Sequence, residues 1–199
     1  GMLDAPLMLK NKTAPRLREI PGFVFPDGVR VIINFTVDFD AMVFRKFLRE
    51  PKLWCAQGEF GGRTGLWRLL DVFREFEVPA TLFLPGQTGL LYPEAIRRAV
   101  REGHEIANHM WDHHIPDTRE EEAEHLARTD GLIREFTGRY PAGTRSEHDL
   151  AALRDHAYAY VSYTPQGAFP CYVYHESIGR WMLNLPISFF HDDAMYFYF

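Results

Sequence analysis

The chain has 199 residues, of which 46% are hydrophobic and 25% charged, the usual balance of a globular protein with one substantial core. Its net charge of -5 argues against nucleic acid or an anionic membrane surface as the main partner. No apolar run reaches membrane-spanning length, and the two widely separated cysteines, Cys55 and Cys171, suggest no disulfide framework.

The N-terminal part predicts an extended arm over residues 1–27, because it is rich in proline and charge, followed by one domain over residues 28–199. Residues 2–12 lack the apolar segment of a signal peptide, so we expect a cytoplasmic protein. A turn at Pro26-Asp27-Gly28 precedes Val31–Phe35, a β-branched and aromatic run that predicts a buried strand.

Two carboxylates follow this strand. Asp38 and Asp40 lie two residues apart and therefore share one face of an extended chain, whereas Val37 and Phe39 take the other face. Neighbouring carboxylates at the end of an apolar strand are costly unless a cation or a shared proton relieves their repulsion. The simpler alternative is that these residues form an acidic turn exposed to solvent. Further potential metal ligands elsewhere in the sequence are needed to distinguish a metal site from such a turn.

The middle of the chain alternates helix and strand signals. Residues 41–57 are mixed, and Phe44, Phe47 and Leu48 predict a short helix that Pro51 ends. Residues 58–65 predict a glycine-rich loop without the Gly-Lys-Ser/Thr ending of a phosphate loop. Thr64 is expected to cap an amphipathic helix, and residues 80–84 to form the next strand. A further helix is expected from Pro93 until Gly103 ends it.

The second group of ligands follows a predicted strand at His104–Asn108. His109 and His113 are four residues apart, a spacing that places two side chains on the same face of a helical turn. Two imidazoles arranged in this way can bind one zinc-type ion. The pair alone is weak, since such spacings occur by chance, but together with Asp38 and Asp40 it favours a metal site.

The remaining signals continue the alternation, with a helix at 118–136, a strand at 142–145, a helix at 149–156 and strands at 158–163, 171–174 and 182–186. Glu120-Glu121-Glu122 is read as a solvated first turn that suits the helix dipole. The pattern predicts an α/β fold with a parallel sheet, whose chemistry sits at the carboxyl ends of the strands. Asp38, His109 and Arg145 all follow predicted strands, so we expect them to meet.

In order and combination, these motifs resemble the polysaccharide deacetylase family, also called carbohydrate esterase family four. The resemblance runs from about Val29 to the C-terminus and rests on residues 38–40, 57–61, 78–86, 103–114, 137–146, 185–189 and 192–193. The Asp-x-Asp spacing resembles that found in one branch of the family, which includes a peptidoglycan deacetylase and relatives that act on cyclic amides such as allantoin. The resemblance implies a distorted (β/α) barrel of about seven strands, which we expect to be incomplete at its C-terminal end.

The resemblance also implies a metal-dependent hydrolase that removes an acyl group from an N-acylated sugar or small molecule. Asp40, His109 and His113 are then the metal ligands, Asp38 is the general base, and Arg145 orients that base. One divalent ion is expected, with Zn²⁺ as the first choice and Co²⁺, Ni²⁺ or Mn²⁺ also compatible with such ligands. It would activate water near neutral pH and polarise the amide carbonyl.

Several alternatives stay open at this point. They are a hydrolase of a small cyclic amide, of the allantoinase or cyclic imidase type, and a metal-binding domain without turnover; the sequence also leaves open a homo-oligomer. Ser146-Glu147-His148 departs from the proline-containing stretch that the family usually has after its arginine. The resemblance implies a histidine near the C-terminus as the general acid that protonates the leaving nitrogen, but none of the late histidines stands in a matching motif; they are His148, His175 and His191. Either the chain is a shortened form of a longer protein, or it is naturally short and uses another donor, with His191 as the first candidate. The apolar residues 194–199 favour the first reading, so we expect a chain that binds metal, turns over poorly and leaves an apolar edge open.

Overall fold

The structure is a computed structural model that describes residues 26–146, 148, 152–162, 170–175, 179–187, 191–193 and 196. Except for its last two residues, the expected N-terminal arm lies outside this part of the chain, as does the start of the helix expected at 149–156. Residues 152–155 of that segment form turns rather than an α-helix.

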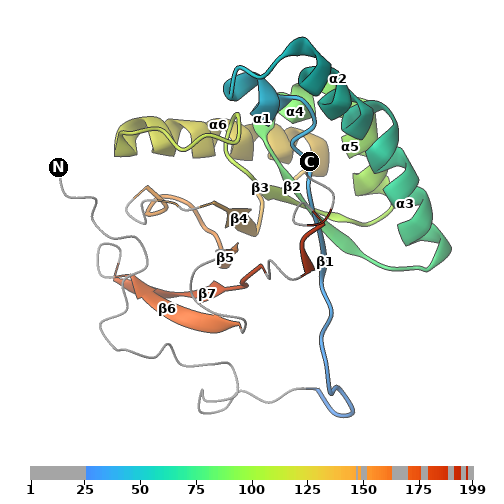
Figure 1. The fold of residues 1–199 in the computed structure, drawn as a ribbon. Coiled ribbons are helices and arrows are strands. Elements are labelled where there is room, and N and C mark those ends of the chain that lie inside the picture. Colours follow the sequence, from blue (N-terminus) through green and yellow to red (C-terminus); the bar gives the residue numbers. More distant parts are fainter. Residues whose placement is uncertain are drawn as a thin grey trace.

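Seven strands form one curled sheet in the order β1-β2-β3-β4-β5-β7-β6 (Figure 1). They are β1 (Phe35–Asp38), β2 (Ala80–Leu84), β3 (Glu105–Asn108), β4 (Gly143–Arg145), β5 (Tyr160–Ser162), β6 (Cys171–His175) and β7 (Arg180–Asn184). Neighbouring strands run parallel, except that β6 and β7 are antiparallel. The expected α/β fold with a barrel-like, mainly parallel sheet is therefore confirmed.

Helices cover the first part of this sheet. They are α1 (Val43–Phe47), α2 (Lys52–Phe60), the π-helical turn η2 (Gly61–Gly65), α3 (Leu66–Glu75), α4 (Gly86–Leu91), α5 (Pro93–Arg101) and α6 (Arg119–Thr137). Both α5 and α6 pack against β3, and α3 packs against α5 (Figure 1). Thr118 caps α6 by accepting a hydrogen bond from the Glu121 amide, and Gly138 ends the helix with a φ of 78°.

Helix α6 contributes to both hydrophobic clusters of the described residues. Ile133 belongs to the cluster that α3 and α5 form with β1, β2 and β3. Leu126 belongs to the second cluster, which includes residues of β5, β6 and β7. Both side chains are almost completely buried, and burial of one such side chain stabilises a fold by about 1.5–3 kcal/mol. The helix therefore couples the two halves of the sheet.

The prediction of a glycine-rich loop at residues 58–65 is wrong. The chain stays helical from α2 through η2 into α3, and Thr64 lies inside η2 and caps nothing. A Cβ atom at Gly58 would lie 2.6 Å from the carbonyl oxygen of Ala41, and one at Gly62 would lie 2.3 Å from the ring of Tyr92. These glycines serve close packing within a helix rather than the flexibility of a loop.

The first strand also begins later than predicted. β1 starts at Phe35, which pairs with Ala80, the first residue of β2. Residues 31–33 have no strand neighbour in the described part of the chain and are 71%, 66% and 71% exposed. Hydrophobic composition alone therefore placed the strand about four residues too early.

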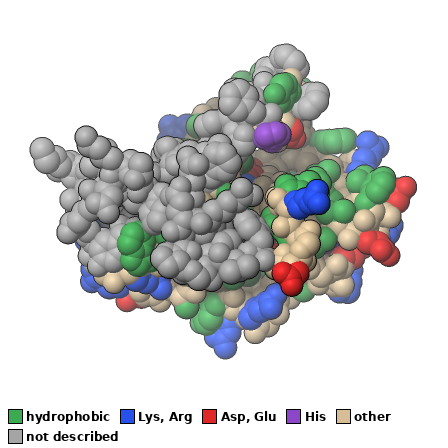
Figure 2. Space-filling view, turned by 90° about the horizontal axis from the view of Figure 1, so that it is seen from below, with side chains coloured by type: hydrophobic (Ala, Val, Ile, Leu, Met, Phe, Trp, Pro, Cys, Tyr) green, Lys and Arg blue, Asp and Glu red, His purple; other side chains and the backbone are tan. Residues whose placement is uncertain are grey.

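Figure 2 shows the molecule from below, with hydrophobic, acidic and basic side chains all present on the described surface and a hollow beside a histidine. Charges of both signs are mixed over the described part of this face. Within the residues described, no helix combines the length and the apolar character needed to cross a membrane.

Candidate active site

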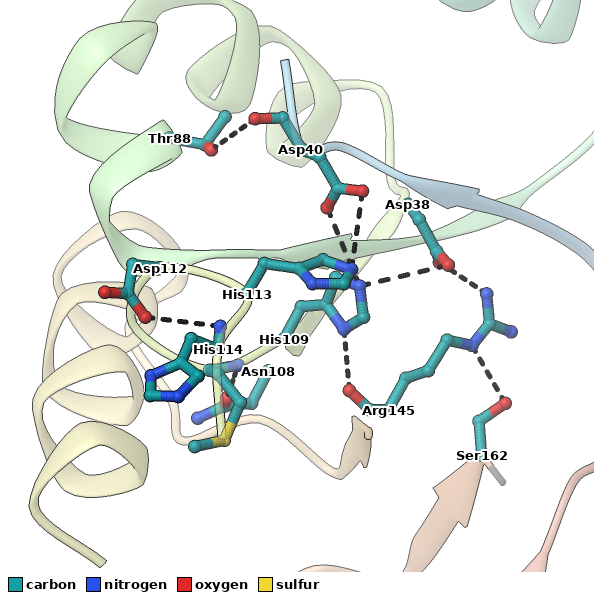
Figure 3. Close-up of polar contacts among 11 residues, drawn as sticks. Asp38, Asp40, Thr88, Asn108, His109, Asp112, His113, His114, Arg145 and Ser162 are labelled. Atoms are coloured by element: carbon teal, nitrogen blue, oxygen red, sulfur yellow. Dashed lines mark hydrogen bonds and ion pairs between the residues drawn. The ribbon is translucent and has the colours of Figure 1, made fainter. Parts of the chain in front are cut away.

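The parallel sheet brings three distant segments to one edge. Asp38 is the last residue of β1, His109 directly follows β3, and Arg145 is the last residue of β4. The register aligns the ends of these strands, because Asp38 pairs with Phe83 and Asn108 pairs with both Leu84 and Thr144. Figure 3 shows the side chains of Asp38, Asp40, His109, His113 and Arg145 converging on one place.

His109 and His113 come together through a turn rather than through a helix. Residues 110–112 form turns, and both Met110 and His113 have positive φ angles, of 65° and 69°. Such angles are unusual for residues other than glycine and persist where surrounding contacts fix them. The Gly86 amide donates to the Met110 carbonyl at 3.0 Å, which holds this turn against the start of α4. The predicted proximity of the two histidines is confirmed, although the helical reason given for it is wrong.

Asp40, His109 and His113 form a compact group of potential metal ligands. One ligand atom from each lies within 4.8 Å of the others. His109 Nε2 is 3.6 Å from Asp40 Oδ1, and His113 Nε2 is 3.6 Å from Asp40 Oδ2. Two atoms that each bind one zinc ion at about 2.1 Å lie about 3–4 Å apart, so these spacings suit a shared ion.

The hydrogen bonds of this group also fit a cation. His109 Nδ1 lies 2.6 Å from the Arg145 carbonyl oxygen, which can only accept, so Nδ1 carries the proton and Nε2 presents a lone pair. That lone pair faces Asp40 Oδ1, and both atoms are buried without a hydrogen-bond partner among the described residues. Two buried acceptors facing each other are unfavourable unless a positive ion lies between them.

Electrostatics within the group point the same way. Burial raises the pKa of Asp40 to about 6, although the nearby His109 acts to lower it. Burial likewise lowers the pKa values of His109 and His113, although Asp38 acts to raise both. The imidazoles therefore favour the neutral form that binds metals, while the carboxyl group gains most from a neighbouring positive charge.

Arg145 fixes the second carboxylate, Asp38, at the edge of this group. Its guanidinium donates to Asp38 Oδ1 at 2.5 Å, to Thr36 Oγ1 at 3.1 Å and to Ser162 Oγ at 3.0 Å. The guanidinium carbon also lies 3.8 Å from the centre of the Phe83 ring. Asp38 Oδ2 remains 3.9 Å from His109 Nε2, so the oxygen that Arg145 does not hold faces the metal ligands.

Comparison with known proteins now decides the family. The sequence pattern of the polysaccharide deacetylase family matches residues 57–161, which is more than half of the chain. The chain belongs to the polysaccharide deacetylase family. Members are hydrolases of amide C–N bonds. The peptidoglycan deacetylase of Helicobacter pylori is 34% identical over 90 residues, which cover 44% of this chain and 31% of that protein.

Solved structures of similar proteins agree with this family fold. A crystal structure of a Mycobacterium smegmatis protein assigned to the polysaccharide deacetylases has a TM-score of 0.76 and 28% identity, covering 94% of this chain and 66% of its own. The Puue allantoinase has a TM-score of 0.74 at 21% identity, covering 89% of this chain and 66% of its own, and this likeness concerns the fold alone. The chain thus spans about a third of the curated relative and two thirds of these structural neighbours.

Three contacts of this deacetylase-family site were missed in the sequence. Thr36 and Ser162 position the Arg145 guanidinium, and the Phe44 ring packs on His113 with ring centres 4.3 Å apart. Thr36 had a detectable signal, since it lies two residues before Asp38 and so shares its face of the strand. Ser162 and Phe44 had none, because their roles depend on how distant segments pack.

Two further histidines, His114 and His148, lie apart from the metal group. His114 stacks on Phe47 and points away from the ligands (Figure 3). His148 is 1% exposed, with its ring nitrogens at 2.8 Å from Thr144 Oγ1 and 2.9 Å from Glu122 Oε1. It is therefore unable to reach a substrate. The reading of Glu122 as a solvated residue is also wrong, because its partner His148 draws it into the core.

Proposed function

We propose that the protein is a metal-dependent hydrolase that removes the acyl group from an N-acylated amino sugar. The observation that supports this most directly is the convergence of Asp40, His109 and His113 beside a second carboxylate, Asp38, that Arg145 holds in place. The two unpartnered buried atoms, Asp40 Oδ1 and His109 Nε2, fit a cation between them. Zn²⁺ is our first choice, and Co²⁺, Ni²⁺ and Mn²⁺ also suit these ligands.

In this proposal the three ligands have separate tasks. Asp40 supplies negative charge, and the two imidazoles supply neutral nitrogen donors, a set that leaves room for water or substrate. When bound, a divalent ion makes water more acidic and polarises a carbonyl group. The hydrogen bond from His109 Nδ1 to the Arg145 carbonyl fixes the ring orientation before any ion arrives.

Asp38 then acts as the general base. It takes a proton from the attacking water as the water oxygen bonds to the amide carbon. Arg145 occupies Oδ1, so Oδ2 is left to accept that proton on the side of the ligands. The guanidinium also steadies the carboxylate against rotation, since it is itself tied to Thr36 and Ser162.

The leaving nitrogen must receive a proton when the C–N bond breaks, because an amide anion is a very poor leaving group. His148 is excluded as the donor by its burial and its two partners. We propose that Asp38, protonated in the first step, returns the proton to nitrogen. The reaction then balances, with one water consumed and a carboxylic acid and an amine released.

The test of this function is the release of amine and acid by the purified protein loaded with Zn²⁺ or Co²⁺. Peptidoglycan and oligomers of N-acetylglucosamine are the first substrates to offer. Acetate and free amine in equal amounts are expected. Metal binding without release of either from these substrates or from formamides would instead favour a binding domain without turnover.

Hydrolysis of a cyclic amide is the second candidate, because the Asp38-x-Asp40 spacing resembles that of the allantoinase-like branch. The fold is also similar to that of an allantoinase. Allantoin and a cyclic imide belong in the same assays for this reason. Ring opening consumes water but releases no acetate, so the two functions give different products. Turnover of the cyclic substrates alone would replace the deacylase proposal.

A further inference from the structure

A buried network of hydrogen bonds contacts the turn between His109 and His113. At its centre is the carboxylate of Asp130 in α6, which is 5% exposed. Its Oδ1 accepts hydrogen bonds from Asn108 Nδ2 and from the Tyr158 hydroxyl, each at 2.7 Å. Its Oδ2 lies 2.6 Å from His156 Nδ1. Three donors from three segments therefore meet on one buried carboxylate.

Asn108 connects this network to the metal ligands. It is the last residue of β3, is fully buried, and immediately precedes His109. While its Nδ2 donates to Asp130, its Oδ1 accepts from the Met110 amide at 2.8 Å. Met110 is the first of the two residues with positive φ in this turn. The carboxamide thus caps the turn that aims His109 toward Asp40.

Tyr158 sets the position of that carboxamide from the other side. Its hydroxyl lies 3.2 Å from Asn108 Nδ2 and donates to Asp130, and its ring stacks on His156 with ring centres 5.2 Å apart. Burial, and then the charge of Asp130, raises the pKa of Tyr158 well above its usual range, so the hydroxyl keeps its proton. A protonated hydroxyl can donate to Asp130 and accept from Asn108 at the same time.

We propose that Tyr158, Asp130 and Asn108 are positioning residues that set the geometry, and hence the affinity, of the candidate metal site. This inference rests on the metal site of the proposed function and extends it to residues that touch neither ion nor substrate. Helix α6 holds the turn at a second point as well, because Thr129 Oγ1 also donates to the Met110 carbonyl at 2.9 Å. Both the amide and the carbonyl of Met110 are therefore fixed from outside the ligand group.

The chain offers a matched pair of variants for the test. Tyr158 and Tyr160 lie two residues apart, and each hydroxyl donates to a carboxylate, that of Asp130 at 2.7 Å or that of Glu105 at 3.1 Å. Tyr158→Phe removes a hydroxyl that belongs to the network. Tyr160→Phe removes an equivalent hydroxyl that belongs to a different group and serves as the control.

Co²⁺ titration of the folded proteins gives both the affinity and the visible absorption spectrum, which reports ligand geometry independently of activity. Asn108→Ala is expected to weaken Co²⁺ binding by about tenfold or more and to change the spectrum at saturation. Tyr158→Phe is expected to weaken it about threefold, whereas Tyr160→Phe stays within experimental error of the wild type. Circular dichroism confirms folding, and if Asn108→Ala does not fold, the tyrosine pair decides.

Wild-type affinity and spectrum in Tyr158→Phe would overturn the inference while leaving the metal site in place. Equal losses in Tyr158→Phe and Tyr160→Phe would also overturn it, since general destabilisation of this segment would then explain both. A wild-type protein that binds no Co²⁺ would remove the metal site itself and this inference with it. The two proposals therefore fail in different ways.

Discussion

His109 is bonded to the main chain of Arg145 and not to its side chain. The ring Nδ1 donates to the Arg145 carbonyl oxygen at 2.6 Å, while the guanidinium of the same residue donates to Asp38. One residue thus orients a metal ligand through its backbone and the candidate base through its side chain. The two tasks are separable, because a substitution at position 145 changes the second and keeps the first.

The first prediction uses this separation. Arg145→Lys should keep metal affinity close to that of the wild type, because the carbonyl that orients His109 remains. Its turnover should fall by about 10²-fold, because an ammonium group does not reproduce the forked contacts to Asp38, Thr36 and Ser162. Metal titration and steady-state kinetics on one preparation measure both quantities. A parallel loss of affinity would show that the side chain also supports the ligands.

Metal content provides the second prediction. The protein purified without chelator should contain about one equivalent of a divalent ion, and His109→Ala should lose it, because the remaining two ligands hold an ion much less firmly. Elemental analysis measures both, and His114→Ala is the matched control, since that ring points away from the group. An absence of metal in the wild type would contradict the prediction.

The third prediction concerns the base. Asp38→Asn should retain the metal and lose a factor of roughly 10²–10⁴ in kcat, the usual contribution of a general base. Asparagine keeps the shape of the side chain and can still accept a bond from Arg145, so folding should be unaffected. Near-normal turnover would remove Asp38 from the mechanism, and loss of metal would make it a ligand instead.

The fourth prediction is that Asp40→Asn stabilises the protein without metal and destabilises it, relative to the wild type, with metal. Its pKa is raised from 3.8 to about 6, so the folded state holds the proton more tightly than the unfolded state. Ionisation of Asp40 therefore costs stability as the pH rises from about 4 to about 6. At pH 7 without metal, Asp40→Asn should raise the free energy of unfolding by about 1–3 kcal/mol, and this gain should vanish below pH 4.

With saturating Zn²⁺ the order should reverse, because only the wild type retains all three ligands and gains the full stabilisation from binding. Urea unfolding at several pH values, with chelator and with Zn²⁺, measures both effects. If Asp40→Asn were less stable than the wild type even with chelator at pH 7, ionisation of Asp40 would not carry the desolvation cost inferred here.

Two glycines give the fifth prediction. A Cβ atom at Gly86 would lie 2.2 Å from the Trp111 ring and 2.9 Å from Thr129 Oγ1. Gly86→Ala should therefore cost about 1–3 kcal/mol and weaken metal binding, because relief of the clash displaces the turn that carries the histidines. Gly131 lies inside α6 with nothing within 4 Å, so Gly131→Ala should stabilise by about 0.5–1 kcal/mol. Thermal unfolding distinguishes the two opposite outcomes.

The sequence was most informative where one local rule decided the structure. The helix predicted at 118–136 is confirmed as α6 (Arg119–Thr137), because a capping threonine and a terminal glycine specify its ends. The meeting of Asp38, His109 and Arg145 was also predictable, since parallel strands align their carboxyl ends. The roles assigned to these residues, like the cytoplasmic location, remain predictions.

Features that depend on tertiary packing were not predictable in this way. Gly58 and Gly62 resemble loop residues in sequence, and only the proximity of Ala41 and Tyr92 shows why a helix needs them. Glu122 resembles a solvated acid until His148, 26 positions later, is found beside it. The turn between His109 and His113 depends on the network behind it, which no spacing rule contains.

The order of strands in the sheet has a consequence for how the protein folds. Asp40 and His109 lie 69 positions apart in the sequence, and β2 lies between the strands that precede them. The ligands can meet only after β1 and β3 have both docked on β2, so a tight metal site should arise late in folding. The rate of metal binding during refolding would therefore report when this sheet assembles. We expect metal binding to follow the rise of the helical circular dichroism signal.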